Sequence, residues 1–276
     1  MPRPRKRFAQ HWLRSEAALT KIVAAADLTP TDRLLEIGPG TGILTRKLLP
    51  LAESVVAVEI DRDLCLLLTK QFGRDKKFLL LQGDFLELDW EGILATLPNF
   101  LLPNKVVANI PYNITGPILE KLLGTIAAPN PNPFEAIVLL VQKEVAERLC
   151  AQPSTKAFGA LSVRVQYLAD CQWVCLVPAK AFQPPPKVDS AVVKLIPRAI
   201  EPSAQNPHSL DTLVKLGFAT RRKMLRNNLQ SVVERDRLSQ ILETLNLNPQ
   251  ARAEDLGVSD WVALSNELGS GGEVEM

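Results

Sequence analysis

The chain has 276 residues, of which 46% are apolar and 22% are charged, with a formal net charge of +2 at pH 7. This composition is typical of a globular protein with a sizeable core, and it excludes a disordered or strongly cationic chain. Because the net charge is small, any contact with nucleic acid has to come from local basic patches.

Targeting and membrane segments are the next features that the sequence addresses. We find no apolar run long enough to span a bilayer. The basic start, MPRPRKRF, has no apolar stretch behind it, so it does not predict a secretory signal. The cysteines form no C-x-x-C pair, which indicates reduced thiols rather than zinc ligands or disulfides. We therefore expect a cytoplasmic protein with no membrane contact and no metal site.

Helical and strand-like patterns alternate through the first two thirds of the chain. A helix is predicted to begin at Ser15, which is a favourable N-cap. Five apolar strand segments follow, each succeeded by a loop or helix, within residues 32–42, 53–61, 76–88, 104–112 and 135–150. Near-continuous apolar strands are typical of a parallel sheet covered by helices on both faces. Two further runs, 171–178 and 190–197, predict an antiparallel pair at the sheet edge.

The composition changes at residues 198–208, which are polar, contain two prolines and show no periodicity. We interpret them as a linker. Beyond it the patterns are all helical, within residues 210–233, 235–247, 248–256 and 259–268. The sequence therefore predicts an α/β domain over 1–200 and a small all-α C-terminal domain over 201–276, which ends in a loose tail.

A glycine-rich turn, EIGPGTG, lies between the first strand of this sheet and a helix. Gly38 and Gly40 would allow the backbone to approach a ligand, and the helix offers free N–H groups. The spacing G-x-G-x-G differs from the dinucleotide fingerprint G-x-G-x-x-G, so alone it is also compatible with a structural turn.

Two acids strengthen the ligand interpretation. Glu59 ends the second strand, about 20 residues after Gly38, where an acid commonly accepts ribose hydroxyls. Asp84 follows the third strand and could accept from an adenine amine or simply cap a turn. The carboxyl ends of parallel strands are where such sheets bind ligands. Together these features favour a nucleoside-bearing cofactor, without excluding a nicotinamide.

The whole pattern resembles the S-adenosylmethionine-dependent methyltransferase fold, which is a Rossmann-like class I fold with a mostly parallel, seven-stranded sheet. The resemblance implies that Gly38 and Gly40 lie under the methionine and ribose of S-adenosyl-L-methionine. It also implies that Glu59 holds the ribose and that Asp84 reads the adenine.

The fourth strand ends in the sequence NIPY, which matches the motif of methyltransferases that act on exocyclic amines of nucleic acids. The match implies that the side-chain oxygen of Asn109 and the backbone oxygen of Ile110 accept the two hydrogens of an adenine N6. Their pull directs the nitrogen lone pair towards the methyl group. Pro111 stiffens the turn, and Tyr112 offers a flat face to the base. Asn109 also borders the cofactor in this family.

The N-terminal stretch RKRFAQHWL is similar to a motif of ribosomal RNA adenine dimethyltransferases that reads Gly-Gln-Asn-Phe-Leu. Ala9, His11 and Trp12 replace the Gly, Asn and Phe of that motif, whereas Gln10 and Leu13 match it. The resemblance implies that this segment folds over the cofactor, with His11 and Leu13 in contact with it.

Two later stretches resemble the same family. FQPPPKVDS matches F-x-P-x-P-x-V-x-S, which implies that Phe182 stacks on the other face of the target adenine; the alternative is a core aromatic residue. ATRRKMLRNNL resembles the small-subunit branch, and it predicts a helix whose cations contact RNA phosphates: Arg221, Arg222, Lys223 and Arg226. The alternative for this cluster is a solvated helix face.

The resemblance extends from about Arg5 to about Leu256 and indicates the small-subunit, KsgA-type family. It implies dimethylation of the N6 amines of two adjacent adenines in the loop of the 3′-terminal hairpin of 16S ribosomal RNA. It also implies a role in small ribosomal subunit biogenesis and a monomeric enzyme. Three alternatives stay open: a large-subunit methyltransferase of the macrolide-resistance type, an assembly or transcription factor that has lost catalysis, and a nicotinamide-dependent oxidoreductase.

Overall fold

The computed structural model describes residues 10–220 and 222–270. Its contacts divide the chain into two compact units. The first comprises the chain up to Leu122, together with Asn132–Ala146 and Cys171–Pro197. The second comprises Leu123–Pro131, Glu147–Asp170 and the chain from Arg198 onward. The second unit therefore includes an internal segment as well as the helical region that the sequence predicts after residue 200.

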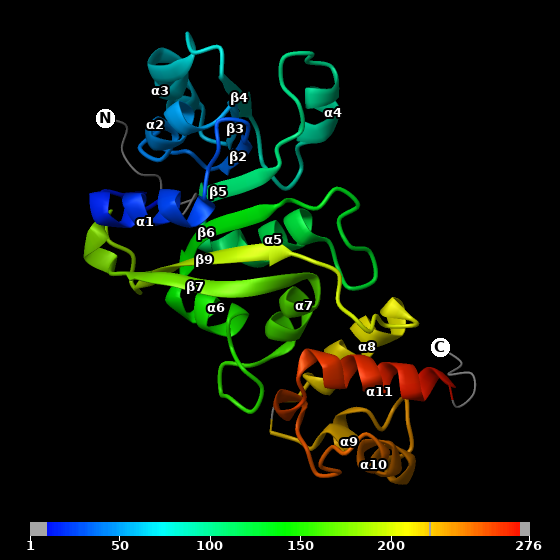
Figure 1. Cartoon of the computed structure of the whole chain (residues 1–276). Coiled ribbons are helices and arrows are strands. Elements are labelled where there is room, and N and C mark those ends of the chain that lie inside the picture. The colour runs from blue at the N-terminus through cyan, green and yellow to red at the C-terminus, as the bar shows by residue number, and fades with distance from the viewer. Residues whose placement is uncertain (1–9, 221, 271–276) are drawn as a thin grey trace. The chain divides into compact units, whose positions relative to one another are not determined.

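The first unit is built on a seven-stranded sheet in the order β4-β3-β2-β5-β6-β9-β7, which Figure 1 shows from edge to edge. Strands β2 to β6 pair in parallel, and β9 runs antiparallel to β6. The strands are β2 (Arg33–Ile37), β3 (Ser54–Glu59), β4 (Phe78–Gln82), β5 (Lys105–Asn109), β6 (Ala136–Gln142), β7 (Ala169–Val177) and β9 (Ser190–Pro197). The α/β prediction is confirmed, and the two late strands do lie side by side at the sheet edge.

Helices cover this sheet because its strands are apolar on both faces. Alternate strand residues such as Leu34, Val55 and Val107 join the first three helices in one core, and their neighbours Leu35 and Val56 are equally buried. The helices are α1 (Glu16–Ala26), α2 (Thr45–Leu48), α3 (Arg62–Phe72), α4 (Trp90–Ala95) and α5 (Thr115–Leu123), with α6 (Lys143–Leu149) after β6. Short 3-10 helices occur at η2 (Leu49–Leu51), η3 (Tyr112–Ile114) and η4 (Ala179–Ala181).

A second, two-stranded sheet joins segments that are distant in the sequence. Strand β1 (Trp12–Leu13) pairs antiparallel with β8 (Phe182–Gln183), with Leu13 opposite Phe182. The N-terminal segment is thereby fixed beside the proline-rich loop. The helix after it begins as predicted, because the Ser15 side chain accepts a hydrogen bond from the Ala18 N–H.

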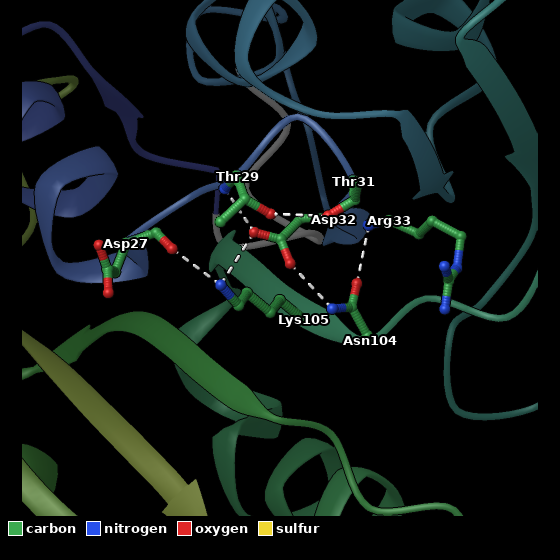
Figure 2. A network of polar contacts seen from close by, with 7 residues as sticks. All are labelled: Asp27, Thr29, Thr31, Asp32, Arg33, Asn104 and Lys105. Atoms are coloured by element: carbon green, nitrogen blue, oxygen red, sulfur yellow. Dashed lines mark hydrogen bonds and ion pairs between the residues drawn. The ribbon is translucent and has the colours of Figure 1, made fainter.

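The amino ends of β2 and β5 are joined by a network of polar contacts, which Figure 2 shows. Asp32 precedes β2, and its carboxylate lies 2.9 Å from the Nζ atom of Lys105, the first residue of β5. Asn104 donates to the other oxygen of Asp32 over 2.8 Å and accepts the Arg33 N–H over 2.7 Å. The backbone N–H of Thr29 also donates to Asp32. These contacts fix the register of the two central strands at this end.

The second unit is helical. It contains α7 (Ala160–Leu168), α8 (Pro207–Gly217), α9 (Leu225–Asn228), α10 (Arg235–Thr244) and α11 (Val258–Ser270), with η5 (Ala253–Asp255). Trp261 of α11 is fully buried, and a Cβ atom at Gly217 would lie 2.4 Å from its ring. A glycine is therefore required where α8 ends. In the described part of the chain, no helix is long and apolar enough to cross a membrane.

Two helical predictions in this unit are wrong in detail. The pattern over 210–233 predicts one long helix, but α8 ends at Gly217 and α9 begins at Leu225. The side chain of Asn228 donates to the carbonyls of Gly217 and Thr220, which stabilises the turn between them. Residues 248–256 form only the short η5, because Asn248 accepts the Gln250 N–H and builds a turn instead of starting a helix.

Candidate active site

The predicted ligand residues meet at the carboxyl ends of neighbouring strands. Gly38 follows β2, Glu59 ends β3, Asp84 follows β4 and Asn109 ends β5. All four line one cavity of about 340 Å³, a size within the range typical of small-molecule sites. The strand order reverses between β2 and β5, so this cavity lies at the switch point where open α/β sheets bind ligands.

The glycine turn has the backbone conformation that its sequence requires. Gly38 and Gly40 have φ angles of +66° and +60°, which side-chain-bearing residues rarely adopt. Gly42 has a different role, because a Cβ atom there would lie 2.5 Å from the Phe72 ring. The first two glycines therefore shape the cavity, and the third allows close packing of α3.

Glu59 is held in place by the turn that it faces. Its Oε2 accepts the Gly40 N–H over 3.1 Å, and its Oε1 accepts the Asp61 N–H over 2.9 Å. Burial raises its pKa, although both hydrogen bonds favour the charged form. A carboxylate has about four acceptor positions, so these contacts leave capacity for a ligand hydroxyl.

Asp84 is half-buried at the cavity wall. Its Oδ1 accepts the Leu86 N–H over 2.9 Å. Its Oδ2 has no hydrogen-bond partner among residues 10–220 and 222–270. The side chain therefore combines a fixed orientation with a free acceptor, which suits an amine donor on a ligand.

The N-terminal segment closes one side of the cavity. Gln10, His11, Trp12 and Leu13 all line it. Gln10 donates to Asp61, the N-cap of α3, over 3.2 Å, and the Trp12 ring lies against Gly40. The buried Trp12 Nε1 has no partner in the described chain, so it can donate to a polar ligand in the cavity. These side chains therefore fit a nucleoside-bearing cofactor.

His11 lies beside the NIPY motif. Its ring stacks on Tyr112 with centroids 6.1 Å apart, and its Nδ1 lies 2.8 Å from the Pro184 carbonyl. Because a carbonyl only accepts, Nδ1 carries the proton. The Nδ2 of Asn109 donates to the His11 carbonyl over 3.4 Å, which leaves the Asn109 oxygen free to accept.

Tyr112 is fixed by a contact with β9. Its hydroxyl lies 2.5 Å from the Oγ of Ser190, the buried first residue of β9. Burial raises the pKa of Tyr112 to about 12, so the ring stays neutral at physiological pH. Ile110 is buried, and Pro111 has the extended conformation that turns the chain into η3. All four motif residues line the cavity.

Other predicted residues lie elsewhere. Phe182 is 3% exposed, belongs to the apolar core of the first unit and does not line the cavity. Arg222 and Lys223 precede α9, and Arg226 lies on it, so the predicted helix carries only one of these cations. Arg221 lies outside the described residues, as does Ala9.

Sequence reasoning also missed residues that lie at the cavity or contact its lining. Glu36 lines the cavity although it lies inside β2, with its carboxylate accepting the Thr45 hydroxyl over 2.6 Å. Burial raises its pKa to about 8. An acid within the apolar run LLEI was a usable signal, because a buried charge in such a strand is rarely accidental. Ser190 ends the matched stretch FQPPPKVDS, but that match did not indicate a contact between its hydroxyl and Tyr112.

The strand order and the cavity at its switch point fit the Rossmann-like class I methyltransferase fold. The model of the family described as Ribosomal RNA adenine dimethylase matches residues 1–270. The chain belongs to this family. Membership confirms the prediction of an S-adenosyl-L-methionine-dependent methyltransferase of ribosomal RNA adenines.

Similar proteins cover nearly the whole chain. The Ribosomal RNA small subunit methyltransferase A of Nostoc punctiforme is 69% identical and aligns with 97% of this chain and 96% of its own length. That of Trichormus variabilis is 70% identical over 98% and 99%. Among solved structures, a dimethyladenosine transferase from Plasmodium falciparum is 30% identical with a TM-score of 0.78, covering 94% of this chain and 98% of that one. The 23S rRNA methyltransferase ErmE is 27% identical with a TM-score of 0.71, over 94% and 99%.

Proposed function

We propose that this protein transfers methyl groups from S-adenosyl-L-methionine to the N6 amines of two adjacent adenines in the 3′-terminal hairpin loop of 16S ribosomal RNA. It acts as a monomer in the cytoplasm during small-subunit biogenesis. Relatives at 69% and 70% identity, named as small subunit methyltransferases, support the small-subunit substrate. The likeness to ErmE supports the chemistry but does not favour the large subunit, because that identity is only 27%.

The observation that carries the proposal is the orientation of Asn109. Its amide nitrogen is engaged by the His11 carbonyl, so its oxygen is the atom available to a ligand, beside the Tyr112 ring. The Asn109 oxygen and the Ile110 carbonyl accept the two N6 hydrogens and direct the nitrogen lone pair. Tyr112 stacks on the base, which has to leave its own stack to enter the cavity.

The remaining residues bind and orient the cofactor. Glu59 accepts the ribose hydroxyls, Asp84 accepts the adenine amine, and Gly38 and Gly40 let the backbone approach. Leu13 covers the cofactor from the N-terminal side. When bound, the cofactor supplies an activated methyl group on a positively charged sulfur, so positioning and electrostatics account for most of the rate. No side chain has to act as a general base, because the N6 proton becomes acidic once the nitrogen is methylated.

Contacts with RNA outside the cavity are assigned to the cations around α9. Arg222, Lys223 and Arg226, together with Arg221, are suited to phosphate contacts, which weaken as salt increases. Phe182 remains a candidate for the second face of the adenine, and it would have to leave its buried position in the core to serve there.

The test is methyl transfer from labelled S-adenosyl-L-methionine to small and large ribosomal subunits that lack the modification, with the product nucleoside identified. We expect N6,N6-dimethyladenosine in the small subunit. Asn109→Ala should reduce the rate by about 10²–10³-fold, as expected for a preorganised polar group in a reaction site. Cofactor affinity should change much less.

The matched control is Asn99→Ala, which alters an exposed asparagine outside the cavity and should leave the rate unchanged. Labelling of the large subunit alone would indicate a large-subunit methyltransferase of the macrolide-resistance type. No transfer to either subunit, with cofactor binding intact, would support a binding factor that has lost catalysis.

A further inference from the structure

Lys121 lies on α5, the helix that follows the NIPY motif, and it is half-buried. Its ammonium group donates to three backbone carbonyls, those of Phe85 at 2.6 Å, Leu86 at 3.0 Å and Leu88 at 2.9 Å. An ammonium group has three N–H donors, so all of them are directed to one short loop. A solvent-exposed helix lysine would make no such set of contacts.

The loop that Lys121 contacts is the one that carries Asp84. The Leu88 N–H donates to the Asp84 carbonyl over 2.8 Å, and the Leu86 N–H donates to the Asp84 side chain over 2.9 Å. The carbonyls of Phe85, Leu86 and Leu88 therefore point towards Lys121, while Asp84 and Phe85 also line the cavity. Converging carbonyl dipoles repel one another, and a cation between them favours this conformation.

The charges around Lys121 are consistent with a fixed ammonium group. Burial lowers its pKa, while Asp84, Glu91 and Asp89 oppose that shift. The Nζ atom also lies 5.1 Å from the centroid of the Phe85 ring, at which distance a cation is attracted to the aromatic face. The side chain thus contacts the loop through both polar and aromatic groups.

We propose that Lys121 is a positioning residue that holds residues 84–88 in the conformation in which Asp84 selects the adenine base of the cofactor. Lys121 thereby connects this loop to α5, the helix that follows the NIPY motif and η3. The proposal rests on the proposed function, since it requires Asp84 to contact the adenine. It assigns to Lys121 an effect on cofactor selectivity and affinity, acting through the loop and without touching the ligand.

The experiment compares two ligands that differ in the group read by Asp84. S-adenosylhomocysteine carries the 6-amino group, and S-inosylhomocysteine carries an oxygen there. Dissociation constants are measured by calorimetry for the wild type, Lys121→Met, Asp84→Asn and the control Lys70→Met, which alters an exposed lysine on α3. We expect the wild type and the control to prefer the adenosyl ligand by roughly tenfold or more, as for a hydrogen bond to a charged group.

Lys121→Met keeps the apolar stem and removes the ammonium group. We expect the preference to fall close to one, with S-adenosylhomocysteine binding about tenfold more weakly and S-inosylhomocysteine changing little. Asp84→Asn should lose the same preference. In methyl transfer, the KM for S-adenosyl-L-methionine should rise about tenfold while kcat at saturation stays within about twofold.

The outcomes separate this proposal from the proposed function. A wild-type preference that persists in folded Lys121→Met, or an equal loss for both ligands, would overturn the positioning role alone. A wild type without preference would overturn the assignment of Asp84 and this proposal together. If Lys121→Met does not fold, Lys121→Gln, which keeps a polar group but no charge, decides by the same ratio.

Discussion

The two ends of the central strands carry similar polar residues, but these residues differ in how fully their hydrogen-bonding groups are paired within the chain. At the amino ends, Asp32, Asn104 and Lys105 bond to one another and to backbone groups, as Figure 2 shows. Lys105 also donates to the Asp27 carbonyl over 2.8 Å. These three side chains therefore have hydrogen-bond partners within the chain.

At the carboxyl ends, Glu59, Asp84 and Asn109 are only partly satisfied. Each is fixed by at least one hydrogen bond that involves a backbone group, and each keeps an acceptor that faces the cavity. Residue type therefore does not distinguish a structural network from a ligand site. The difference lies in whether the hydrogen-bonding capacity is used within the chain, and this can be tested at both ends.

The largest effect is expected at the amino ends. Lys105→Met removes the cation from a pair whose side chains are 11% and 5% exposed. An uncompensated Asp32 should lower the free energy of unfolding by about 3–5 kcal/mol at pH 7. Urea denaturation measures this loss, and the affinity of the folded variant for S-adenosylhomocysteine should be unchanged.

The stabilisation that the wild-type Asp32–Lys105 pair provides depends on pH. Burial would raise the pKa of Asp32, but hydrogen bonds from Thr29, Lys105 and Asn104 outweigh it and hold the pKa below its usual value of 3.8. The stabilisation is therefore present above that pKa and is lost as the pH falls through the folded value. The double variant Lys105→Met/Asp32→Asn should recover part of the loss. If Lys105→Met alone lowered the free energy of unfolding by less than about 1 kcal/mol, the pair would behave like an exposed salt bridge, which would contradict a buried structural network.

An effect of comparable size, but dependent on pH, is expected from Glu36, which is buried at the cavity. Burial raises its pKa from 4.5 to about 8, so between these values the native state holds a proton that the unfolded state releases. Stability should therefore fall as the pH rises through this window, by up to about 1.4 kcal/mol per pH unit. Glu36→Gln should remove this slope.

The measurement is urea denaturation between pH 5 and pH 8.5 without cofactor. At pH 8 the Gln variant should be the more stable protein, and near pH 5 the two should differ least. The control Glu243→Gln alters an exposed acid of α10 and should keep the wild-type slope. Parallel pH profiles for wild type and Glu36→Gln would mean that Glu36 is ionised in the native state.

Local patterns predicted the parts of the site that depend on single strands. Glu59 and Asn109 were identified because each ends an apolar run, and parallel strands bring their carboxyl ends to one edge. The glycine turn was predicted because glycine adopts positive φ angles at low cost, and its glycines do have positive φ angles in the structure. These features need no knowledge of distant contacts.

Other parts depend on tertiary contacts that leave no local signal. The pairing of β1 with β8 brings His11 to Pro184, 173 residues later in the chain. In the sequence, Lys121 cannot be distinguished from an exposed helix lysine, because its three carbonyl partners lie 33 to 36 residues earlier in the chain. The continuous amphipathic pattern over 210–233 likewise hid the turn that Asn228 stabilises.

The smallest effect is expected from Ser190, whose hydroxyl contacts the Tyr112 hydroxyl beside the cavity. Ser190→Ala removes the only hydrogen bond that the structure gives to the Tyr112 hydroxyl within the described residues, so the ring is less well fixed. We expect a two- to tenfold lower rate of methyl transfer, corresponding to about 0.5–1.5 kcal/mol, with cofactor affinity unchanged. Tyr112→Phe should have a similar effect, and the double variant should lose no more than either single variant, because both remove one contact. Additive losses would mean that Ser190 acts through the strand β9 and not through Tyr112. The Tyr112 hydroxyl would then have to be counted among the groups that face the ligand, and not among those paired within the chain.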